Sequence, residues 1–343
     1  MAAPWTERYR PRQLAAIQHQ VAAVSAAQQC VATGDLPHLL LYGPAGTGKT
    51  SLVYALAHEL FGPRFWRSRL FEFNASVDRR INAVREKIKS IAQTVIVAPP
   101  PEVQETYPCP PIQIILLDEA DALTKESQAA LRRIMEDYSE STRFCIICNY
   151  PSQLIPPIVS RCARFAFSAL PSDAIVSRLQ TICQAEARAS GSLGEQATAA
   201  LREIARLSAG DMRAAITLCQ TAVQHCQTLG KTLTPECVRL LSGAIPPDVV
   251  SDSIRIISDT TLMPAVMLDR LDATILRQGY PSLELIAAIW KRLCFEDQVH
   301  EDIRYAVGLE YQRAGLATAR RACDRAVLER FAVVMHSKYA QYA

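Results

Sequence analysis

The sequence contains no apolar run long enough to cross a membrane, and its first residues, MAAPWTERYRPRQL, lack the apolar segment of a secretory signal. We therefore expect a soluble protein that is neither secreted nor bound to a membrane. An excess of one sign of charge is also missing, because 37 basic side chains face 34 acidic ones and the net charge is +3. Any surface for nucleic acid must therefore be local.

Glycine is scarce, at 13 of 343 residues, and the C-terminal half is rich in Ala, Leu and Ile, which favours helical domains there. No internal repeat stands out, so a repeat architecture is not expected. The length exceeds what one hydrophobic core usually supports, and two or three domains are expected.

Cysteine is not scarce, but the placement of the eleven cysteines argues against a disulfide scaffold, because most lie inside apolar runs. Cys145 and Cys148 are spaced as a zinc-ligand pair would be, yet no second pair at zinc spacing accompanies them. We expect a reduced, intracellular protein.

One stretch, GPAGTGKT at residues 43–50, matches the phosphate-binding pattern G-x-x-x-x-G-K-[ST]. An apolar run at residues 39–42 leads into it, and a helix is expected to begin near Lys49. The glycines let several backbone N–H groups turn toward one point, where the positive end of the helix also lies. Lys49 can reach the β- and γ-phosphates, and the Thr50 hydroxyl can ligate Mg²⁺. A chance glycine-rich turn is the alternative, which the preceding strand disfavours.

A second nucleotide signal is the apolar run at residues 112–119, IQIILLDE, which ends in two acidic residues. Such a run is typical of a buried parallel strand that delivers carboxylates at its C-terminal end. Asp118 would hold Mg²⁺, and Glu119 would act as the general base for the attacking water. A further strand at residues 143–149 ends in Asn149, which could hydrogen-bond the water or the γ-phosphate, or merely cap a turn.

Strands and helices alternate up to about residue 170, after which helical patterns follow one another to the C-terminus. This order predicts an α/β fold with a parallel sheet, followed by helical domains. The expected domains are a nucleotide-binding domain at residues 1–170 and two helical domains, at residues 171–244 and 245–343, which the resemblance described next identifies as a lid and a collar.

With these residues in place, the sequence resembles the AAA+ ATPase superfamily and, within it, the small subunits of replication factor C, most closely those numbered 4 in vertebrates and 2 in budding yeast. The matching stretches are PWTERYRP, LLLYGPAGTGKTS, ILLDEAD, QAALRRIME, TRFCIICNY, SRCARFAF and SAGDMRAAI. They extend over most of residues 4–216, and their combination is specific. The resemblance implies an AAA+ P-loop sheet with a helical lid and an all-α collar that serves oligomerisation.

The resemblance also assigns roles to individual residues. Asp118 and Glu119 correspond to Walker B, Asn149 to sensor 1 and Arg213 to sensor 2, while Arg161 corresponds to an arginine finger that acts on the ATP of a neighbouring subunit. Such an arginine contributes on the order of 10³ to 10⁵ in rate. The implied nucleotide contacts are Thr6, Arg10, Gly43, Pro44, Ala45, Gly46, Thr47, Gly48, Lys49, Thr50, Ser51, Asn149 and Arg213.

Two stretches depart from the family's pattern. Where the family usually has NASDERGI, this chain has Val77 in place of an acid and Arg80 in place of a glycine. Within the phosphate loop, Ala45 replaces the second proline, at a position that the motif leaves free. The first departure changes the charge beside the helix expected to face DNA.

The resemblance implies an ATP-dependent, nuclear subunit of a hetero-oligomeric clamp loader, expected to be a pentamer, that opens the sliding clamp PCNA and places it on primer–template DNA. The candidate DNA contacts, on a basic helix at residues 78–93, are Arg80, Arg85, Lys87 and Lys89. The candidate clamp contacts, spaced as a clamp-binding element, are Gln128, Leu131, Ile134 and Met135. A solvated helix face is the usual explanation of charges like the first set, and core packing explains the spacing of the second set equally well.

Two rival functions each fit part of the sequence. Residues 118–121, DEAD, suggest an RNA helicase, but such an enzyme needs a second α/β domain, and the chain after residue 170 reads as helical. The other rival is a scaffold subunit that binds nucleotide without hydrolysing it. Lys49, Glu119 and Asn149 argue against this inactive site.

Overall fold

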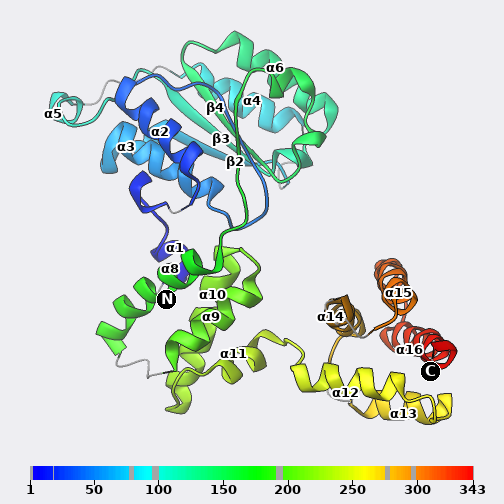
Figure 1. The fold of residues 1–343 in the computed structure, drawn as a ribbon. Helices are drawn as coiled ribbons and strands as arrows, with labels where there is room; N and C mark the ends of the chain where they lie inside the picture. The colour runs from blue at the N-terminus through cyan, green and yellow to red at the C-terminus, as the bar shows by residue number, and fades with distance from the viewer. Residues whose placement is uncertain are drawn as a thin grey trace. The chain divides into compact units, whose positions relative to one another are not determined.

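The computed structural model describes residues 3–17, 19–76, 81–94, 100–190, 196–274, 279–294 and 299–342. The chain forms two compact units, Met1–Val238 and Arg239–Ala343, which run from blue to green and from green to red in Figure 1. The predicted nucleotide-binding domain lies in the first unit, together with residues 171–238 of the predicted lid. The division falls within α11 (Pro235–Ser242), whereas the sequence predicted a boundary after residue 244.

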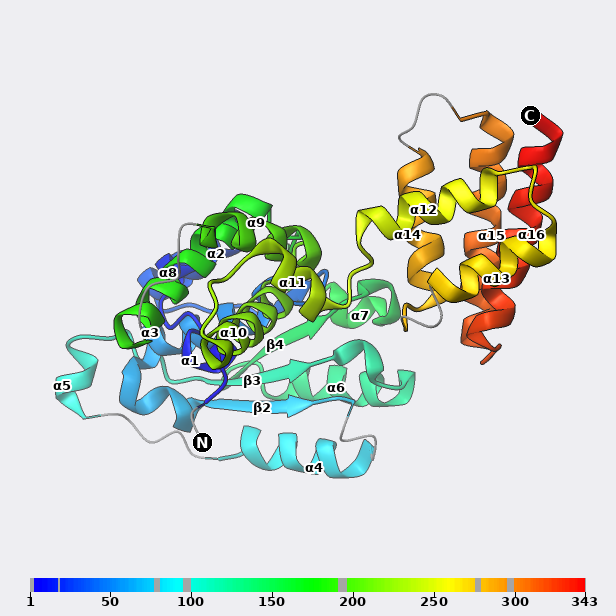
Figure 2. The same cartoon turned by 90° about the horizontal axis from the view of Figure 1, so that it is seen from below.

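The first unit contains a parallel sheet of five strands in the order β2-β3-β4-β1-β5. The strands are β1 (Leu39–Tyr42), β2 (Leu70–Asn74), β3 (Gln113–Asp118), β4 (Thr142–Cys148) and β5 (Ala163–Ala166). Figure 2 shows β2, β3 and β4 side by side. Because the strands are parallel, the residues that follow β1, β3 and β4 meet at one edge of the sheet, where the phosphate loop begins.

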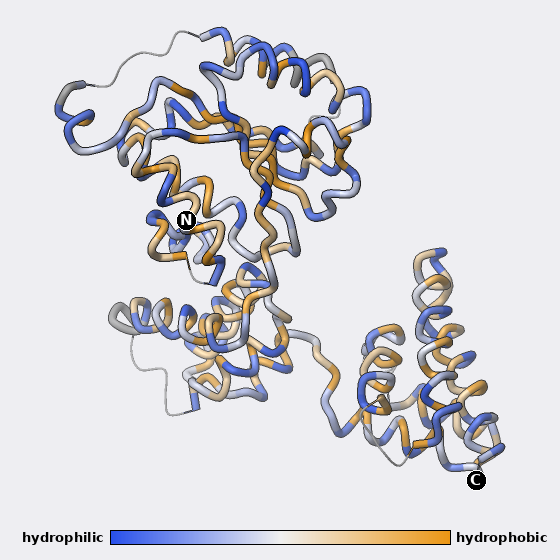
Figure 3. The backbone as a smooth tube through the Cα atoms, turned by 45° about the horizontal axis from the view of Figure 1, so that its top comes forward, coloured by the Kyte–Doolittle hydropathy of each residue, from blue (hydrophilic) through white to orange (hydrophobic). Residues whose placement is uncertain are grey.

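Helices cover both faces of this sheet. In β1, Leu39 and Leu41 face a core formed with α2 (Val21–Thr33) and α3 (Lys49–Arg69), while Leu40 faces a second core. The second core includes α6 (Lys125–Asp137) and Ile88 of α4 (Ile81–Ala92). Successive strand side chains point to opposite faces, so a strand covered on both sides reads as a continuous apolar run. Figure 3 shows this apolar character gathered on the strands.

Two helix boundaries differ from those expected. The helix that begins at Lys49 was expected to end near residue 60, but it resumes beyond a kink and reaches Arg69. Gly62 causes the kink, because its φ of 75° and ψ of 163° are not helical and Pro63 follows it. The helical pattern of the sequence extends from about residue 15 to residue 33, but the helix begins only at Val21. The remaining short elements are α1 (Trp5–Arg8), η1 (Leu14–Ala16), α5 (Pro101–Gln104), η2 (Ala120–Ala122), η3 (Pro151–Gln153) and α7 (Pro156–Val159).

The lid completes the first unit as a group of packed helices. They are α8 (Ser172–Ser190), α9 (Ala197–Ser208), α10 (Met212–Leu229) and α11. Asp211 caps α10 by accepting hydrogen bonds from the N–H groups of Arg213 at 2.8 Å and Ala214 at 3.0 Å. This cap fixes the start of the helix that carries Arg213.

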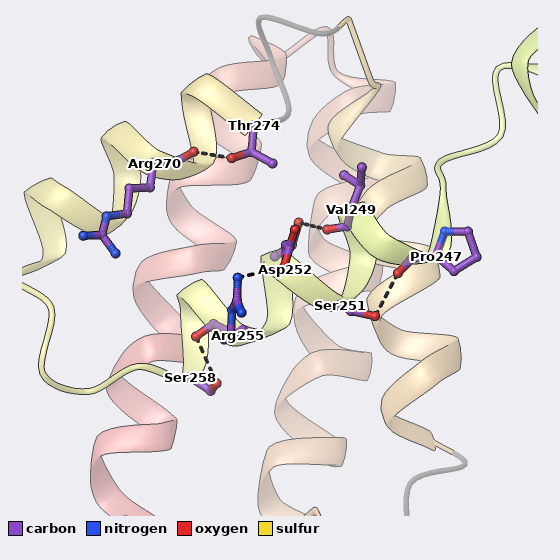
Figure 4. Close-up of polar contacts among 9 residues, drawn as sticks. Pro247, Val249, Ser251, Asp252, Arg255, Ser258, Arg270 and Thr274 are labelled. Carbon is purple, nitrogen blue, oxygen red and sulfur yellow. Dashed lines mark hydrogen bonds and ion pairs between the residues drawn. The ribbon is translucent and has the colours of Figure 1, made fainter.

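The second unit is helical and has its own core, centred on residues such as Leu285, Val307 and Phe331. Its helices are α12 (Pro247–Ser258), α13 (Pro264–Thr274), α14 (Ser282–Cys294), α15 (Glu301–Ala319) and α16 (Asp324–Tyr342). Figure 4 shows local polar contacts along α12 and α13, such as the Ser251 hydroxyl that donates to the Pro247 carbonyl oxygen. Among the described helices of both units, none has the length and apolar character required to cross a membrane.

Candidate nucleotide site

The phosphate loop joins the C-terminal end of β1 to the start of α3. Gly43 and Gly46 have φ angles of 136° and 67°, which glycine adopts without a steric penalty. A Cβ atom on Gly43 would lie 2.1 Å from the Phe167 carbonyl oxygen. One on Gly46 would lie 1.7 Å from Oδ1 of Asp211. Both glycines are therefore required by close contacts as well as by the turn.

Lys49 turns its buried side chain back into this loop. Its Nζ donates to the carbonyl oxygens of Gly43 and Pro44, both at 2.7 Å, and lies 3.5 Å from Oδ1 of Asn149. Burial lowers the pKa of Lys49 from its usual 10.5, and the negative charge of Asp118 opposes that effect. The ammonium thus lies between the phosphate loop and the end of β4, where the motif places a contact with the terminal phosphates.

Asp118 and Glu119 follow one another at the end of β3. Oδ2 of Asp118 accepts a hydrogen bond from the Thr50 hydroxyl at 3.2 Å, and Oδ1 accepts one from the Glu119 N–H at 2.9 Å. A hydroxyl and a carboxylate beside a phosphate loop suit Mg²⁺, which prefers oxygen ligands and retains waters and phosphate oxygens. Thr50 and Asp118 therefore fit the predicted metal site. Among the described residues, no group of three or more His, Cys, Asp or Glu side chains could hold a metal.

Asn149 follows the last residue of β4, and its position is fixed by Asp121, to which the sequence alone gave no role. Oδ2 of Asp121 accepts hydrogen bonds from the backbone N–H groups of Asn149, at 3.1 Å, and Tyr150, at 3.3 Å. The contact joins the turn after β3 to the end of β4. In the sequence, Asp121 is visible only as the last residue of the DEAD stretch, and nothing there indicates its contact with Asn149 and Tyr150.

The N-terminal segment and the lid supply the other walls of the site. Arg178 of α8 donates to the Tyr9 carbonyl oxygen at 2.6 Å, and the guanidinium of Arg10 lies 4.9 Å from the centre of the Tyr54 ring. The lid reaches the phosphate loop directly, because the Met212 N–H donates to the Gly46 carbonyl oxygen at 3.1 Å. Segments far apart in the sequence therefore enclose the loop.

These elements surround a cavity of about 220 Å³. The predicted residues that line it are Thr6, Arg10, Ala45, Gly46, Thr47, Gly48, Lys49, Thr50, Ser51, Asp118, Glu119, Asn149 and Arg213. Gly43 and Pro44 do not line it and act through Lys49. Further lining residues that were not predicted include Glu7, Tyr9, Pro11, Ile17, Arg178 and Ile216. Tyr9 and Pro11 belong to the aromatic and cationic stretch WTERYRP near the N-terminus, a weak signal for a nucleotide site. No feature of the sequence points to Arg178.

Arg161 is not among the residues that line this cavity. Its guanidinium forms an ion pair with Glu136 of α6 and donates to the Pro157 carbonyl oxygen at 2.9 Å. Its side chain is 38% exposed, so it remains accessible from outside the chain.

The four residues of the predicted clamp-binding element on α6 are buried inside this chain. Gln128, Leu131, Ile134 and Met135 are between 1% and 6% exposed. Leu131, Ile134 and Met135 belong to the core on that face of the sheet. Gln128 donates to the carbonyl oxygens of Leu123 and Gln153 and accepts from the Ile155 N–H. This burial favours packing, the alternative that the sequence left open, and clamp binding through these residues stays a prediction.

The predicted DNA contacts fall largely outside the described residues. Arg80 and Val77 are not described at all, and the side chains of Arg85 and Lys87 are not described within α4. Lys89 is described and exposed. The role of α4 in DNA binding therefore stays a prediction.

Residues 39–170 match the family model of the ATPase family associated with various cellular activities (AAA). Replication factor C subunit 2 from Saccharomyces cerevisiae is 44% identical over 253 residues, which are 73% of this chain and 70% of that protein. The subunit 2 protein from Oryza sativa is 42% identical over 305 residues, covering 87% and 84% of the two chains. Subunit 4 from Homo sapiens is 38% identical over 285 residues, covering 82% and 74%.

Solved structures of RuvB from Thermotoga maritima have a similar fold. One of them, a single-residue variant, superposes with a TM-score of 0.52 at 18% identity, over 77% of this chain and 84% of that one. At this identity the likeness concerns the fold alone, and it agrees with the parallel sheet and the helices that follow it.

Proposed function

The chain belongs to the replication factor C small subunits, which are AAA ATPases of the clamp loader, and we propose that it hydrolyses ATP at a site that a neighbouring subunit completes. The chain is thus a nucleotide-binding clamp-loader component that acts in DNA replication. One observation carries the proposal of hydrolysis: the phosphate loop, Glu119, Asn149 and Arg213 line a single cavity. A protein that only bound nucleotide could use Asp118 for Mg²⁺ but would need no second carboxylate, such as Glu119, to act as a general base.

In the proposed mechanism, each side chain of the cavity has one task. Glu119 accepts the proton of the attacking water, and Asn149 orients that water or the γ-phosphate. Lys49 and Arg213 stabilise the negative charge that develops on the transferred phosphoryl group. Mg²⁺ held by Thr50 and Asp118 would neutralise part of the phosphate charge when bound. Glu119 is exposed in the cavity, so water can reach it.

We propose that Arg161 completes the equivalent site of an adjacent subunit. Three features support this role: the side chain is partly exposed, it does not line the cavity of its own chain, and its partner Glu136 is also at the surface. To reach a neighbour's γ-phosphate, the guanidinium would exchange the carboxylate of Glu136 for phosphate oxygens. Such an exchange of one anionic partner for another makes hydrolysis depend on assembly.

The partners follow from the family. We propose that the chain assembles with the other replication factor C subunits into a hetero-oligomer, a pentamer, in the nucleus. There it would act on the sliding clamp PCNA and primer–template DNA. The basic helix α4 supplies the proposed DNA contacts, and Lys89 is their described and exposed member. The four α6 residues proposed as clamp contacts are buried in this chain, so binding to the clamp would require them to become accessible.

Turnover by the reconstituted assembly tests the proposal. Glu119→Gln in this chain should remove one site's contribution to ATP hydrolysis while leaving nucleotide binding intact, because the substitution keeps the size of the side chain and removes the base. Arg161→Ala should also lower turnover, by removing charge stabilisation from a neighbour's site. If neither variant changes turnover, the chain is a nucleotide-binding scaffold.

A further inference from the structure

Asp121 lies between the two strands that carry the reacting groups. It belongs to the short helix η2, one turn after Asp118 and Glu119, yet its carboxylate bonds to the chain that leaves β4. Oδ2 accepts both the Asn149 N–H at 3.1 Å and the Tyr150 N–H at 3.3 Å. This one oxygen therefore satisfies two N–H groups that lie beyond the end of the strand.

The backbone around Asp121 is held at both ends. Glu119 has a φ of 54°, in the left-handed region, and its carbonyl oxygen accepts from the Ala122 N–H at 2.9 Å. The chain therefore turns sharply after Glu119 and brings Asp121 back toward the sheet. The same turn that exposes the carboxylate of Glu119 thus presents the carboxylate of Asp121 to β4.

We propose that Asp121 is a positioning residue for ATP hydrolysis: it holds the backbone of Asn149 so that the side-chain amide faces Lys49 and the terminal phosphate. Oδ1 of Asn149 lies 3.5 Å from Nζ of Lys49, so a small displacement of this backbone would move the amide out of reach. The inference rests on the proposed hydrolytic function. It assigns the fourth residue of DEAD a task separate from those of Asp118 and Glu119.

An electrostatic role for Asp121 must be distinguished from this geometric one, because its negative charge also favours the charged form of Lys49. Asp121→Asn removes the charge but keeps an oxygen that can accept both N–H groups. Asp121→Ala removes both. A geometric role requires the two variants to differ, whereas a purely electrostatic role requires them to behave alike.

The experiment measures ATP turnover of the reconstituted assembly as a function of ATP concentration. We expect Asp121→Ala to lower the kcat of this chain's site about ten- to hundredfold, the cost of misplacing a catalytic group by about 1 Å. In the assembly this appears as the loss of nearly the whole contribution that Glu119→Gln removes, with a smaller change in KM. Asp121→Asn should retain kcat within about twofold of the unsubstituted assembly. Equal losses in the two variants, or no loss in Asp121→Ala, would overturn the proposal.

Two controls separate a positioning effect from damage to the fold. Asn74→Ala removes a similar contact at the same edge of the sheet, where Oδ1 of Asn74 accepts the Ser76 N–H at 2.9 Å outside the cavity, and kcat should change little. In the double variant, Asp121→Ala should add little to the effect of Asn149→Ala, because both act through one amide. Additive losses would contradict the inference.

Hydrolysis of ATP by this chain and the positioning role of Asp121 can be tested separately. If Lys49→Ala and Glu119→Gln leave turnover unchanged, this chain does not hydrolyse ATP, and the proposed function is wrong. If those two variants lower turnover while Asp121→Ala does not, hydrolysis stands and only the positioning role is wrong.

Discussion

His38, immediately before β1, makes the stability of the folded protein depend on pH. Its Nδ1 accepts the Phe144 N–H at 3.1 Å, and its ring lies edge-on to the Phe144 ring at 5.6 Å. Burial, assisted by the positive charge of Arg143, lowers the pKa of His38 from 6.5 to about 4. The folded protein therefore holds a neutral imidazole well below neutral pH.

The difference between the pKa of His38 in the unfolded chain and in the folded protein predicts a loss of stability in acid. Between pH 6.5 and about 4, the unfolded chain binds a proton at His38 that the folded chain does not, so the free energy of unfolding falls as the pH falls through that window. His38→Gln keeps an acceptor without titrating. Its Tm should therefore decrease less than that of the unsubstituted protein between about pH 7 and about pH 4.5, measured by calorimetry. Parallel pH dependences would show that folding does not lower the pKa of His38.

The residues of the site differ in how far the sequence reveals them. Lys49, Thr50 and Asp118 belong to local motifs whose spacing reflects the chemistry of phosphate and Mg²⁺. Arg178 reaches the site only because α8 packs beside Tyr9, a contact across 169 positions of the sequence. No local pattern encodes such a meeting, since it depends on how the lid folds back over the loop.

At the scale of elements, the parallel strands were predictable because burial on both faces leaves continuous apolar runs such as IILL. For helix α6, the spacing of apolar residues does not decide what its apolar face contacts. A helix that buries one face in its own core and a helix that offers that face to a partner have the same spacing of apolar residues. The outcome depends on the sheet beside it, so α6 could be assigned only from the structure.

Burial of α6 predicts that its apolar residues contribute to stability. Met135 is 1% exposed, and Met135→Ala should lower the free energy of unfolding by about 2–5 kcal/mol, from lost burial and the cavity left behind. Arg133→Ala, on the exposed side of the same helix, should change it by less than about 0.5 kcal/mol. Urea unfolding followed by circular dichroism measures both. A stable Met135→Ala protein with weakened PCNA binding would restore the docking interpretation.

At the scale of the whole molecule, the site belongs entirely to one of the two units. Every residue that lines the cavity lies between Thr6 and Ile216, inside the unit that ends at Val238. The helices from α12 onward have a separate core of their own. Nucleotide binding and the contribution of the C-terminal helices are therefore separable by cutting the chain between α11 and α12.

A fragment of residues 1–244 should fold and bind ATP with a Kd within about twofold of the full chain, because it retains the whole cavity and the core around it. Titration with a fluorescent ATP analogue measures this. The fragment should not enter the assembly if the C-terminal helices are the collar, and it should then hydrolyse almost no ATP, since no neighbour supplies an arginine. Loss of binding by a folded fragment would show that the second unit contributes to the site. Full turnover by the isolated fragment would show instead that the cavity is complete within one chain, and Arg161 would lose its proposed role.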